Sequence, residues 1–281
     1  MTLKPFEVVR MKDSDPSLPA SPIELSVIVP AYREGKRIYG NLQRLVGELE
    51  KLEVPYEVIV VSDGNTDRTV PEVRRLASPR VRLFHYPMNS GKGFALSLGV
   101  SQANGPLVTF IDADMELDPA NIQGFIDLMK TSPCDAVIGS KRHPESKVAY
   151  PAFRRFQSAV YQLLVRLLFQ LRVRDTQTGL KLFRRQVLEE VVPLLAIKRF
   201  AFDLELLVVA RLLGFRNIRE APVRLDYQFE STVNPKAAWR VLWDTTAIFY
   251  RLRLLHYYQR RRADLEREGA ATDPVGAVSE G

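Results

Sequence analysis

The sequence has one cysteine among 281 residues and no apolar run of 18 or more residues. A single cysteine, Cys134, excludes an internal disulfide framework and fits a reducing compartment. The most apolar run, LLVRLLFQL at 163–171, is interrupted by Arg166 and Gln170, so no transmembrane helix is predicted. Residues 1–23 are polar and contain prolines; they show no signal-peptide pattern and are expected to form a flexible lead.

Positive charge is present but unevenly distributed. The formal net charge is +7, and residues 141–174 alone hold eight Lys or Arg against one acid, Glu145. A second basic cluster runs from residue 236 to 262. Such surfaces bind anions, and composition leaves nucleic acid, phosphate and an acidic membrane face all open.

Strand-like and helix-like runs alternate as far as residue 140. Strands are predicted at 25–30, 56–62, 81–86, 106–112 and 134–140, with helices at 36–52, 67–77, 93–103 and 119–130. This order predicts an α/β fold with a mostly parallel sheet flanked by helices, which binds ligands at the carboxyl ends of its strands. The second half predicts helices at 152–171, 184–195 and 202–213, a strand at 218–227 and an amphipathic segment at 236–258.

An acidic run follows the fourth predicted strand, in VTFIDADMELDP at 108–119. Asp112, Asp114, Glu116 and Asp118 occupy every second position, which in an extended chain places them on one face. Carboxylates gathered there would repel each other without a cation among them. The run is therefore either a solvated loop or a metal site.

Two glycine-containing turns follow other strands. SDGNTD at 62–67 ends with Asp67, which is expected to cap the next helix, while Asp63 could bind a base or ribose. NSGKGFA at 89–95 can bring backbone N–H groups and the Lys92 ammonium to a phosphate, although it lacks the spacing of a P-loop. The polar chemistry thus converges on the strand ends.

These motifs carry a family resemblance. PAYREGKRI, VSDGNTDRT, MNSGKGFAL and IDADME together resemble the family 2 inverting glycosyltransferases with a GT-A fold. RDTQTGLKLFRR (174–185) and RFAFDLELLVVA (199–210) are similar to the dolichyl-phosphate β-glucosyltransferase and dolichyl-phosphate mannosyltransferase branch. The resemblance covers residues 24–255. It implies a catalytic domain at 24–230, divided near residue 140 into nucleotide-sugar and acceptor halves. A membrane-interfacial amphipathic helix at 231–260 and a disordered tail at 261–281 are expected to follow.

On the donor side, the resemblance implies that Asp112 and Asp114 bind Mg²⁺ or Mn²⁺, with Glu116 as a third contact. Asp118 is expected to cap the next helix instead. The residues carried over to the nucleotide-sugar pocket are Pro30, Tyr32, Glu34, Asp63, Lys92, Asp112, Ala113 and Asp114. The candidate catalytic residues are Asp112, Asp114 and Asp203.

On the acceptor side, the resemblance implies a polyprenyl phosphate, whose anion needs positioning rather than a general base. The candidates that hold this phosphate are Lys141, Arg142, Arg154 and Ser158, although each basic side chain could simply be exposed. Asp175, Gln177 and Thr178 are expected to shape the acceptor side, with Gly179 in a tight turn. Asp203 could bind the donor sugar, act as a base or cap a helix. The apolar stripe of 152–171 is either core or an interfacial helix.

The resemblance therefore predicts an inverting, metal-dependent transferase that moves a hexose from UDP-glucose or GDP-mannose to polyprenyl phosphate. Its expected location is the cytoplasmic face of a membrane, peripherally attached. The alternatives are a hydroxyl acceptor, with Asp203 or Asp175 as base, or a non-catalytic binding protein. No nucleic-acid partner is expected, because the acidic site repels phosphates without its cation. One departure is FESTV at 229–233, with Thr232 in place of a donor-loop lysine that Lys236 could replace.

Overall fold

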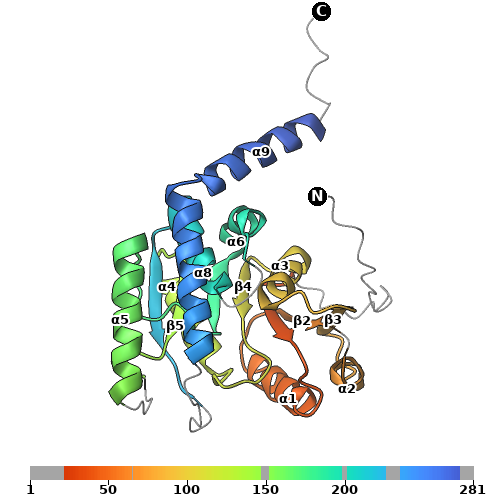
Figure 1. Cartoon of the computed structure of the whole chain (residues 1–281). Helices are drawn as coiled ribbons and strands as arrows, with labels where there is room; N and C mark the ends of the chain where they lie inside the picture. The colour runs from red at the N-terminus through yellow and green to blue at the C-terminus, as the bar shows by residue number, and fades with distance from the viewer. Residues whose placement is uncertain (1–21, 65, 147–151, 198–200, 226–234, 273–281) are drawn as a thin grey trace, which may run out of the picture.

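The computed structural model describes residues 22–64, 66–146, 152–197, 201–225 and 235–272, with side chains described in all of these except 152–157, 235–240 and 269–272. A seven-stranded sheet lies between two layers of helices (Figure 1). The strands in sheet order are β3 (Val81–Tyr86), β2 (Tyr56–Asp63), β1 (Leu25–Ala31), β4 (Leu107–Phe110), β6 (Lys181–Arg184), β5 (Ala136–Ser140) and β7 (Ile218–Pro222).

The sheet is mostly parallel, as the alternating pattern predicts. β1 pairs in parallel with both β2 and β4, β2 with β3, and β5 with β7. β6 is the exception: it runs antiparallel between β4 and β5, and the sequence did not predict it. After β3 the chain crosses to the other side of β1, so the strand order reverses between β1 and β4. A crevice forms at the carboxyl ends of the strands where the order reverses.

Apolar side chains at helical spacing hold the helices on the sheet. One face is covered by α1 (Ile38–Leu49), α2 (Thr69–Arg75) and α4 (Asn121–Thr131), whose buried side chains form one core cluster with the strands. The other face is covered by α3 (Lys92–Gln102), α6 (Arg185–Val191) and α7 (Phe202–Leu212). α5 (Ala152–Phe169), the short 3-10 helix η1 (Val192–Leu194) and α8 (Pro235–Arg253) pack onto that second cluster.

The C-terminal part differs from the expected single helix and disordered tail. α8 ends at Arg253, the chain turns at His256 with a φ of 47°, and α9 (Tyr257–Thr272) follows. α9 begins with a buried anchor, since Tyr258 is 1% exposed and belongs to the core cluster. The expected disorder is therefore wrong for residues 261–272, and residues 273–281 lie outside the described part. None of the described helices is long and apolar enough to span a bilayer.

Candidate active site

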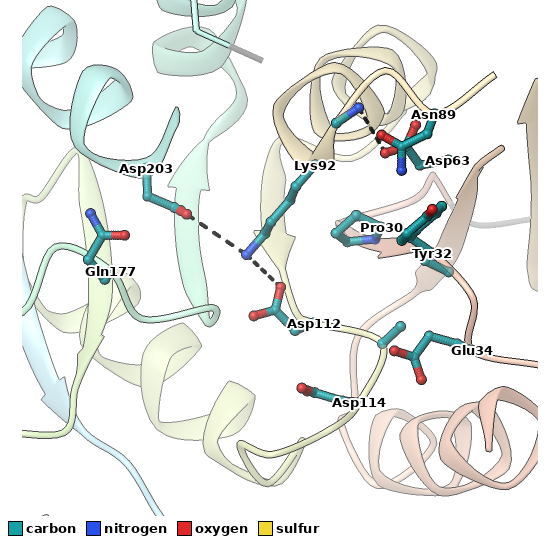
Figure 2. Close-up of a pocket in the computed structure, with 13 residues that line it drawn as sticks. Pro30, Tyr32, Glu34, Asp63, Asn89, Lys92, Asp112, Asp114, Gln177 and Asp203 are labelled. Carbon is teal, nitrogen blue, oxygen red and sulfur yellow. Dashed lines mark hydrogen bonds and ion pairs between the residues drawn. The ribbon is translucent and has the colours of Figure 1, made fainter. Parts of the chain in front are cut away.

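A pocket of about 620 Å³ opens at the carboxyl ends of β1, β2 and β4 (Figure 2). It contains every residue that the sequence assigned to the nucleotide sugar, and two from the second half of the chain, Gln177 and Asp203. The residues that line it are Pro30, Ala31, Tyr32, Glu34, Asp63, Asn89, Gly91, Lys92, Asp112, Ala113, Asp114, Gln177 and Asp203. Ala31, Asn89 and Gly91 were not singled out, although they lie within the motifs that follow β1 and β3.

The turn after β1 is tied to the start of α2. Tyr32 is 41% exposed at the pocket, so it does not pack in the core. The Gly35 N–H donates to Asp67 Oδ2, while Asp67 Oδ1 accepts the Thr69 N–H at 3.0 Å. The N-cap of α2 is Arg68, so Asp67 is not the capping residue that the sequence predicted, although it binds the first N–H of the helix and holds the β1 turn in place. Burial raises the pKa of Glu34, and the Asp114 carboxylate adds to the rise.

Asp63 organises the glycine turn before α3. Its side chain is buried, and its two oxygens accept the backbone N–H groups of Ser90 and Gly91 at 2.6 and 2.8 Å. Gly91 has a φ of 97°, which favours glycine because a Cβ is strained there. The turn starts α3 at Lys92 and directs that ammonium into the pocket (Figure 2). Asp63 thus shapes the pocket wall, and its predicted contact with a base or ribose stays a prediction.

The acidic run does not place its four carboxylates on one face. β4 ends at Phe110, the Met115 N–H donates to the Asp112 carbonyl, and Met115 has a φ of 51°. The alternation argument fails here because it holds only for extended backbone. Glu116 points to Lys141, whose Nζ lies 2.8 Å from Glu116 Oε1. Asp118 Oδ1 accepts the Ala120 N–H just before α4 and pairs with Arg44.

A chain of alternating charges crosses the pocket wall. Lys92 Nζ lies 2.6 Å from Asp112 Oδ1 and 3.8 Å from Asp203 Oδ2. Asp203 Oδ1 in turn lies 2.5 Å from Nζ of Lys181, which is fully buried. Burial opposes the charged form of Lys92, but the Asp203 and Asp112 carboxylates outweigh it and raise the pKa of Lys92. The sequence reasoning did not single out Lys181, although it lies in the quoted RDTQTGLKLFRR motif.

The first two aspartates of the acidic run fit a hard divalent cation. Asp112 and Asp114 both line the pocket and offer carboxylate oxygens, the donors that Mg²⁺ and Mn²⁺ prefer. Burial raises the pKa of Asp114, and the like charges of Asp112 and Glu116 add to the rise, so a cation placed beside Asp114 would favour its ionised form. Among the described residues, no three His, Cys, Asp or Glu side chains gather as a metal site, and Glu116 is not brought together with the two aspartates.

Among the predicted acceptor residues whose side chains are described, Gln177 lines the pocket and the others do not. The Lys141 N–H donates to Asp175 Oδ2, which ties the end of β5 to the loop before β6. Arg142 Nη1 donates to the Ser158 carbonyl, so it contacts the first half of α5. Thr178, in the loop before β6, is buried.

Three further predictions concern residues that are described only in part or not at all. The side chain of Arg154 lies outside the described part of α5. Thr232 and the Lys236 side chain also lie outside the described residues.

The helix-cap alternative for Asp203 is not what the structure shows, because the N-cap of α7 is Ala201 and the Asp203 carboxylate pairs with two lysines.

The chain is similar in sequence to several known glycosyltransferases. The chain is 35% identical over 216 residues to dolichyl-phosphate β-glucosyltransferase ALG5A from Trichomonas vaginalis, which covers 73% of this chain and 66% of that protein. It is 33% identical over 261 residues to dolichyl-phosphate β-glucosyltransferase from Mus musculus, or 87% of this chain and 80% of that protein. Glycosyltransferase AglD from Haloferax volcanii is 32% identical, and the chain spans only 35% of its length.

Solved structures share the fold at low sequence identity. Glucosyl-3-phosphoglycerate synthase from Mycobacterium tuberculosis, in complex with Mn²⁺, UDP-glucose and phosphoglyceric acid, matches with a TM-score of 0.62 and 18% identity. That match covers 81% of this chain and 79% of the synthase. The fold is therefore GT-A-like, with a mostly parallel sheet flanked by helices. Residues 26–192 match the family Glycosyl transferase family 2, and the chain belongs to this family, in a branch similar to the dolichyl-phosphate β-glucosyltransferases.

Proposed function

We propose that this protein is an inverting, metal-dependent glycosyltransferase that moves a hexose from a nucleotide sugar to polyprenyl phosphate. The observation that carries the proposal is the pocket in which Asp112 and Asp114 face Lys92 at the strand-order reversal. The likeness to dolichyl-phosphate β-glucosyltransferases supports a lipid phosphate as acceptor and glucose as the sugar. UDP-glucose is therefore the first donor to test, with GDP-mannose beside it.

The donor binds where the carboxyl ends of β1, β2 and β4 meet. Asp112 and Asp114 would hold the Mg²⁺ or Mn²⁺, because such ions take one or two carboxylates and fill their shells with water and substrate phosphate oxygens. When bound, the cation offsets the negative charge of the leaving nucleoside diphosphate. Lys92 places a second positive charge beside Asp112 and is close enough to share that task.

The acceptor attacks the anomeric carbon from the face opposite the leaving group, which inverts its configuration. A phosphate monoester is already an anion at neutral pH and needs no base. Burial opposes the charged form of Asp203, but Lys181 and Lys92 outweigh it and lower the pKa of Asp203. A carboxylate with a lowered pKa is a poor base, which supports a phosphate acceptor over the alternative of a hydroxyl acceptor.

Two helices offer a surface for the lipid. α5 and α8 lie side by side, joined by the hydroxyl groups of Tyr161 and Thr245 at 3.1 Å (Figure 1). Their inward residues pack in the core, yet Leu163 and Leu167 on α5 and Trp243 on α8 are 58%, 71% and 68% exposed. Exposed apolar side chains on amphipathic helices fit peripheral attachment to a membrane. One side of α5 thus belongs to the core, and the interfacial alternative for the stripe of 152–171 stays a proposal for its exposed side.

Transfer to lipid is the direct test. Purified protein would be incubated with Mn²⁺ or Mg²⁺, polyprenyl phosphate in detergent, and radiolabelled UDP-glucose or GDP-mannose in parallel reactions. We expect label in the organic phase with one donor, and none when the unphosphorylated polyprenol replaces the phosphate. Variants of the pocket carboxylates would be compared with Asp127→Asn, which changes an exposed carboxylate on α4 away from the pocket.

Each other outcome points elsewhere. Donor binding or slow donor hydrolysis without lipid label would contradict the lipid acceptor and favour a hydroxyl acceptor. No binding of either donor in the presence of the cation would contradict the nucleotide-sugar transferase itself. Label transferred equally to polyprenol would show that the phosphate is not the nucleophile.

A further inference from the structure

Lys181 is a charged residue in the middle of the sheet. It is the first residue of β6, where it lies between Phe110 of β4 and Ile138 of β5. Its side chain is fully buried, and its ammonium donates to the Thr178 carbonyl and to Asp203 Oδ1. The aspartate is on a different element, in the first turn of α7. The pair therefore joins the sheet to the helix that closes one side of the pocket.

Stability alone does not account for this pair. Taking two charges out of water costs several kcal/mol per ion, and apolar residues of similar volume often replace buried ion pairs with no loss of stability. Breaking such a pair on one side, by contrast, leaves an uncompensated charge and is costly. A reason to retain both charges lies at the pocket, because the Asp203 carboxylate forms part of its wall.

We propose that Lys181 is a positioning residue, which fixes Asp203 Oδ1 so that Oδ2 faces the pocket as an acceptor for hydroxyl groups of the donor sugar. This inference rests on the proposed function and adds to it the residue that holds the sugar-facing carboxylate. Lys181 itself touches no substrate, since its side chain is fully buried behind Asp203.

One oxygen of the Asp203 carboxylate remains available to accept a hydrogen bond from a ligand in the pocket. Oδ1 is occupied by Lys181 at 2.5 Å, whereas Oδ2 is 3.8 Å from Lys92 Nζ, too long for a direct hydrogen bond. Figure 2 shows the carboxylate pointing from α7 toward Lys92 and Asp112, with the Gln177 amide also at the pocket wall. A sugar between Gln177 and Lys92 would meet an oxygen that has capacity to accept.

The helix that carries Asp203 is itself held in place. Phe202 packs against Gly93 so closely that a Cβ at position 93 would lie 2.5 Å from the Phe202 ring. This contact fixes the start of α7 against α3, the helix that begins with Lys92. With the backbone fixed on one side and Oδ1 fixed by Lys181 on the other, the carboxylate has little rotational freedom. Such preorganisation reduces the entropy lost when a ligand binds.

Charge supports the same role. Burial opposes ionisation of Asp203, yet the Lys181 and Lys92 ammonium groups together lower its pKa, so it is present as a carboxylate. An ionised carboxylate can only accept hydrogen bonds, and each one from a sugar hydroxyl is charge-assisted. Without Lys181, Lys92 at 3.8 Å would be the remaining ammonium beside Asp203 among the described side chains, and the carboxylate would turn toward it.

The test separates the sugar from the nucleotide. Dissociation constants for UDP and UDP-glucose, and for GDP and GDP-mannose, would be measured with Mn²⁺ by calorimetry on the full-length protein. The variants are Lys181→Met, Asp203→Asn and the double variant, with Lys130→Met as the control for an exposed lysine. We expect the affinity for the diphosphate to change much less than the affinity for the nucleotide sugar, because Asp203 acts on the diphosphate only through Lys92. The affinity for the nucleotide sugar should fall about 10- to 100-fold in all three site variants, as for a lost charge-assisted hydrogen bond.

The double variant distinguishes positioning from a general effect on folding. Because Lys181 acts through Asp203, the double variant should lose no more sugar affinity than Asp203→Asn alone. It also keeps the protein testable if Lys181→Met does not fold, since it removes both charges together. An unchanged ratio of nucleotide-sugar to nucleotide affinity in Lys181→Met, or additive losses in the double variant, would overturn the proposal.

The outcome is independent of the acceptor. If Lys181→Met loses sugar affinity as expected but the wild type labels no lipid, the lipid acceptor is contradicted and the role of Lys181 stands. If the wild type labels lipid but Lys181→Met keeps its sugar affinity, only this inference is contradicted. Failure to bind any of the four nucleotides would overturn both.

Discussion

Gly179 lies directly against the carboxylate of Asp112. A Cβ at position 179 would overlap Asp112 Oδ2 and lie 2.6 Å from its Cγ. The sequence predicted a tight turn for this glycine, but its φ is not in the left-handed range, where Gly64, Gly91 and Gly214 lie. Space for the carboxylate therefore requires glycine here. The contact also ties the loop before β6 to the acidic turn after β4.

We expect Gly179→Ala to displace Asp112 and weaken cation-dependent binding of the donor. The three atoms nearest to the added methyl group all belong to the Asp112 carboxyl group, so this carboxylate has to move to make room for it. A misplacement of about 1 Å at a reacting centre can cost about 100-fold in rate. Calorimetric titration of UDP with and without Mn²⁺ would measure the effect on binding, and lipid labelling the effect on turnover.

The matched control is Gly124→Ala. Gly124 lies within α4, and a Cβ there would meet nothing within 4 Å. Alanine favours a helix over glycine by about 1 kcal/mol, so this variant should be at least as stable and fully active. Normal Mn²⁺-dependent binding in Gly179→Ala would contradict the role assigned to the close contact.

Asp114→Ala should abolish transfer. Asp114 lies in the acidic turn and lines the pocket, whereas Glu116, two residues further on, pairs with Lys141. Transfer would be measured over a range of Mn²⁺ concentrations, with Asp127→Asn as the control that keeps its activity. Full activity of Asp114→Ala at every concentration would show that this carboxylate does not hold the cation.

The donor side of the site was predictable because it follows from the order of strands. Parallel strands bring their carboxyl ends to one edge of the sheet, so motifs far apart in the chain, such as those of Asp63 and Lys92, must meet there. Hydrophobic periodicity was sufficient to place the helices on the sheet, as the buried positions of α1 illustrate. Neither the meeting of the strand-end motifs nor the placement of the helices on the sheet required knowledge of individual side-chain contacts.

The remaining features depend on tertiary contacts that local patterns do not encode. β6 begins with a fully buried lysine, and a strand pattern does not predict that because its partner is on α7. The positive φ of Met115 ends the alternation of the acidic run, although methionine gives no turn signal. Residues 261–281 were expected to be disordered because they are polar, whereas α9, which includes 261–272, is anchored by Tyr258, a buried residue that precedes the polar stretch.

Tyr258→Phe should destabilise the fold more at neutral pH than in acid. The Tyr258 O–H donates to Glu205 Oε1 at 2.7 Å, and Glu205 also accepts the Ala196 and Ile197 N–H groups. Burial raises the pKa of Glu205, and the Tyr258 hydrogen bond partly offsets the rise. Without that bond the pKa of folded Glu205 rises further above its unfolded value.

The folded variant then binds more protons than the unfolded chain between those two pKa values, so its stability falls as pH rises through that window. The loss should be smallest at a pH of about 3, below the unfolded glutamate pKa of about 4.3, and reach about 1–3 kcal/mol near about pH 8. Urea unfolding at both pH values would measure it, with Tyr250→Phe, an exposed tyrosine of α8, as control. An equal loss at both pH values would contradict a charge-dependent bond.

Loss of exposed apolar side chains from α5 and α8 should weaken attachment to membranes. Leu167 and Trp243 are 71% and 68% exposed, and burial of a large apolar side chain contributes about 1.5–3 kcal/mol. We expect Leu167→Gln and Trp243→Gln each to lower binding to vesicles of anionic lipid about tenfold, while UDP binding stays unchanged because neither residue lines the pocket. Vesicle flotation would measure the first quantity and calorimetry the second.

The control for this surface is Leu212→Gln, because Leu212 is also exposed but lies at the end of α7. It should float with vesicles as the wild type does. Transfer to polyprenyl phosphate embedded in vesicles should fall with binding in the two surface variants, yet recover in detergent, where the acceptor reaches the pocket without a bilayer. Equal flotation of all three variants would contradict an attachment through α5 and α8, and the lipid would then have to reach the site by another surface.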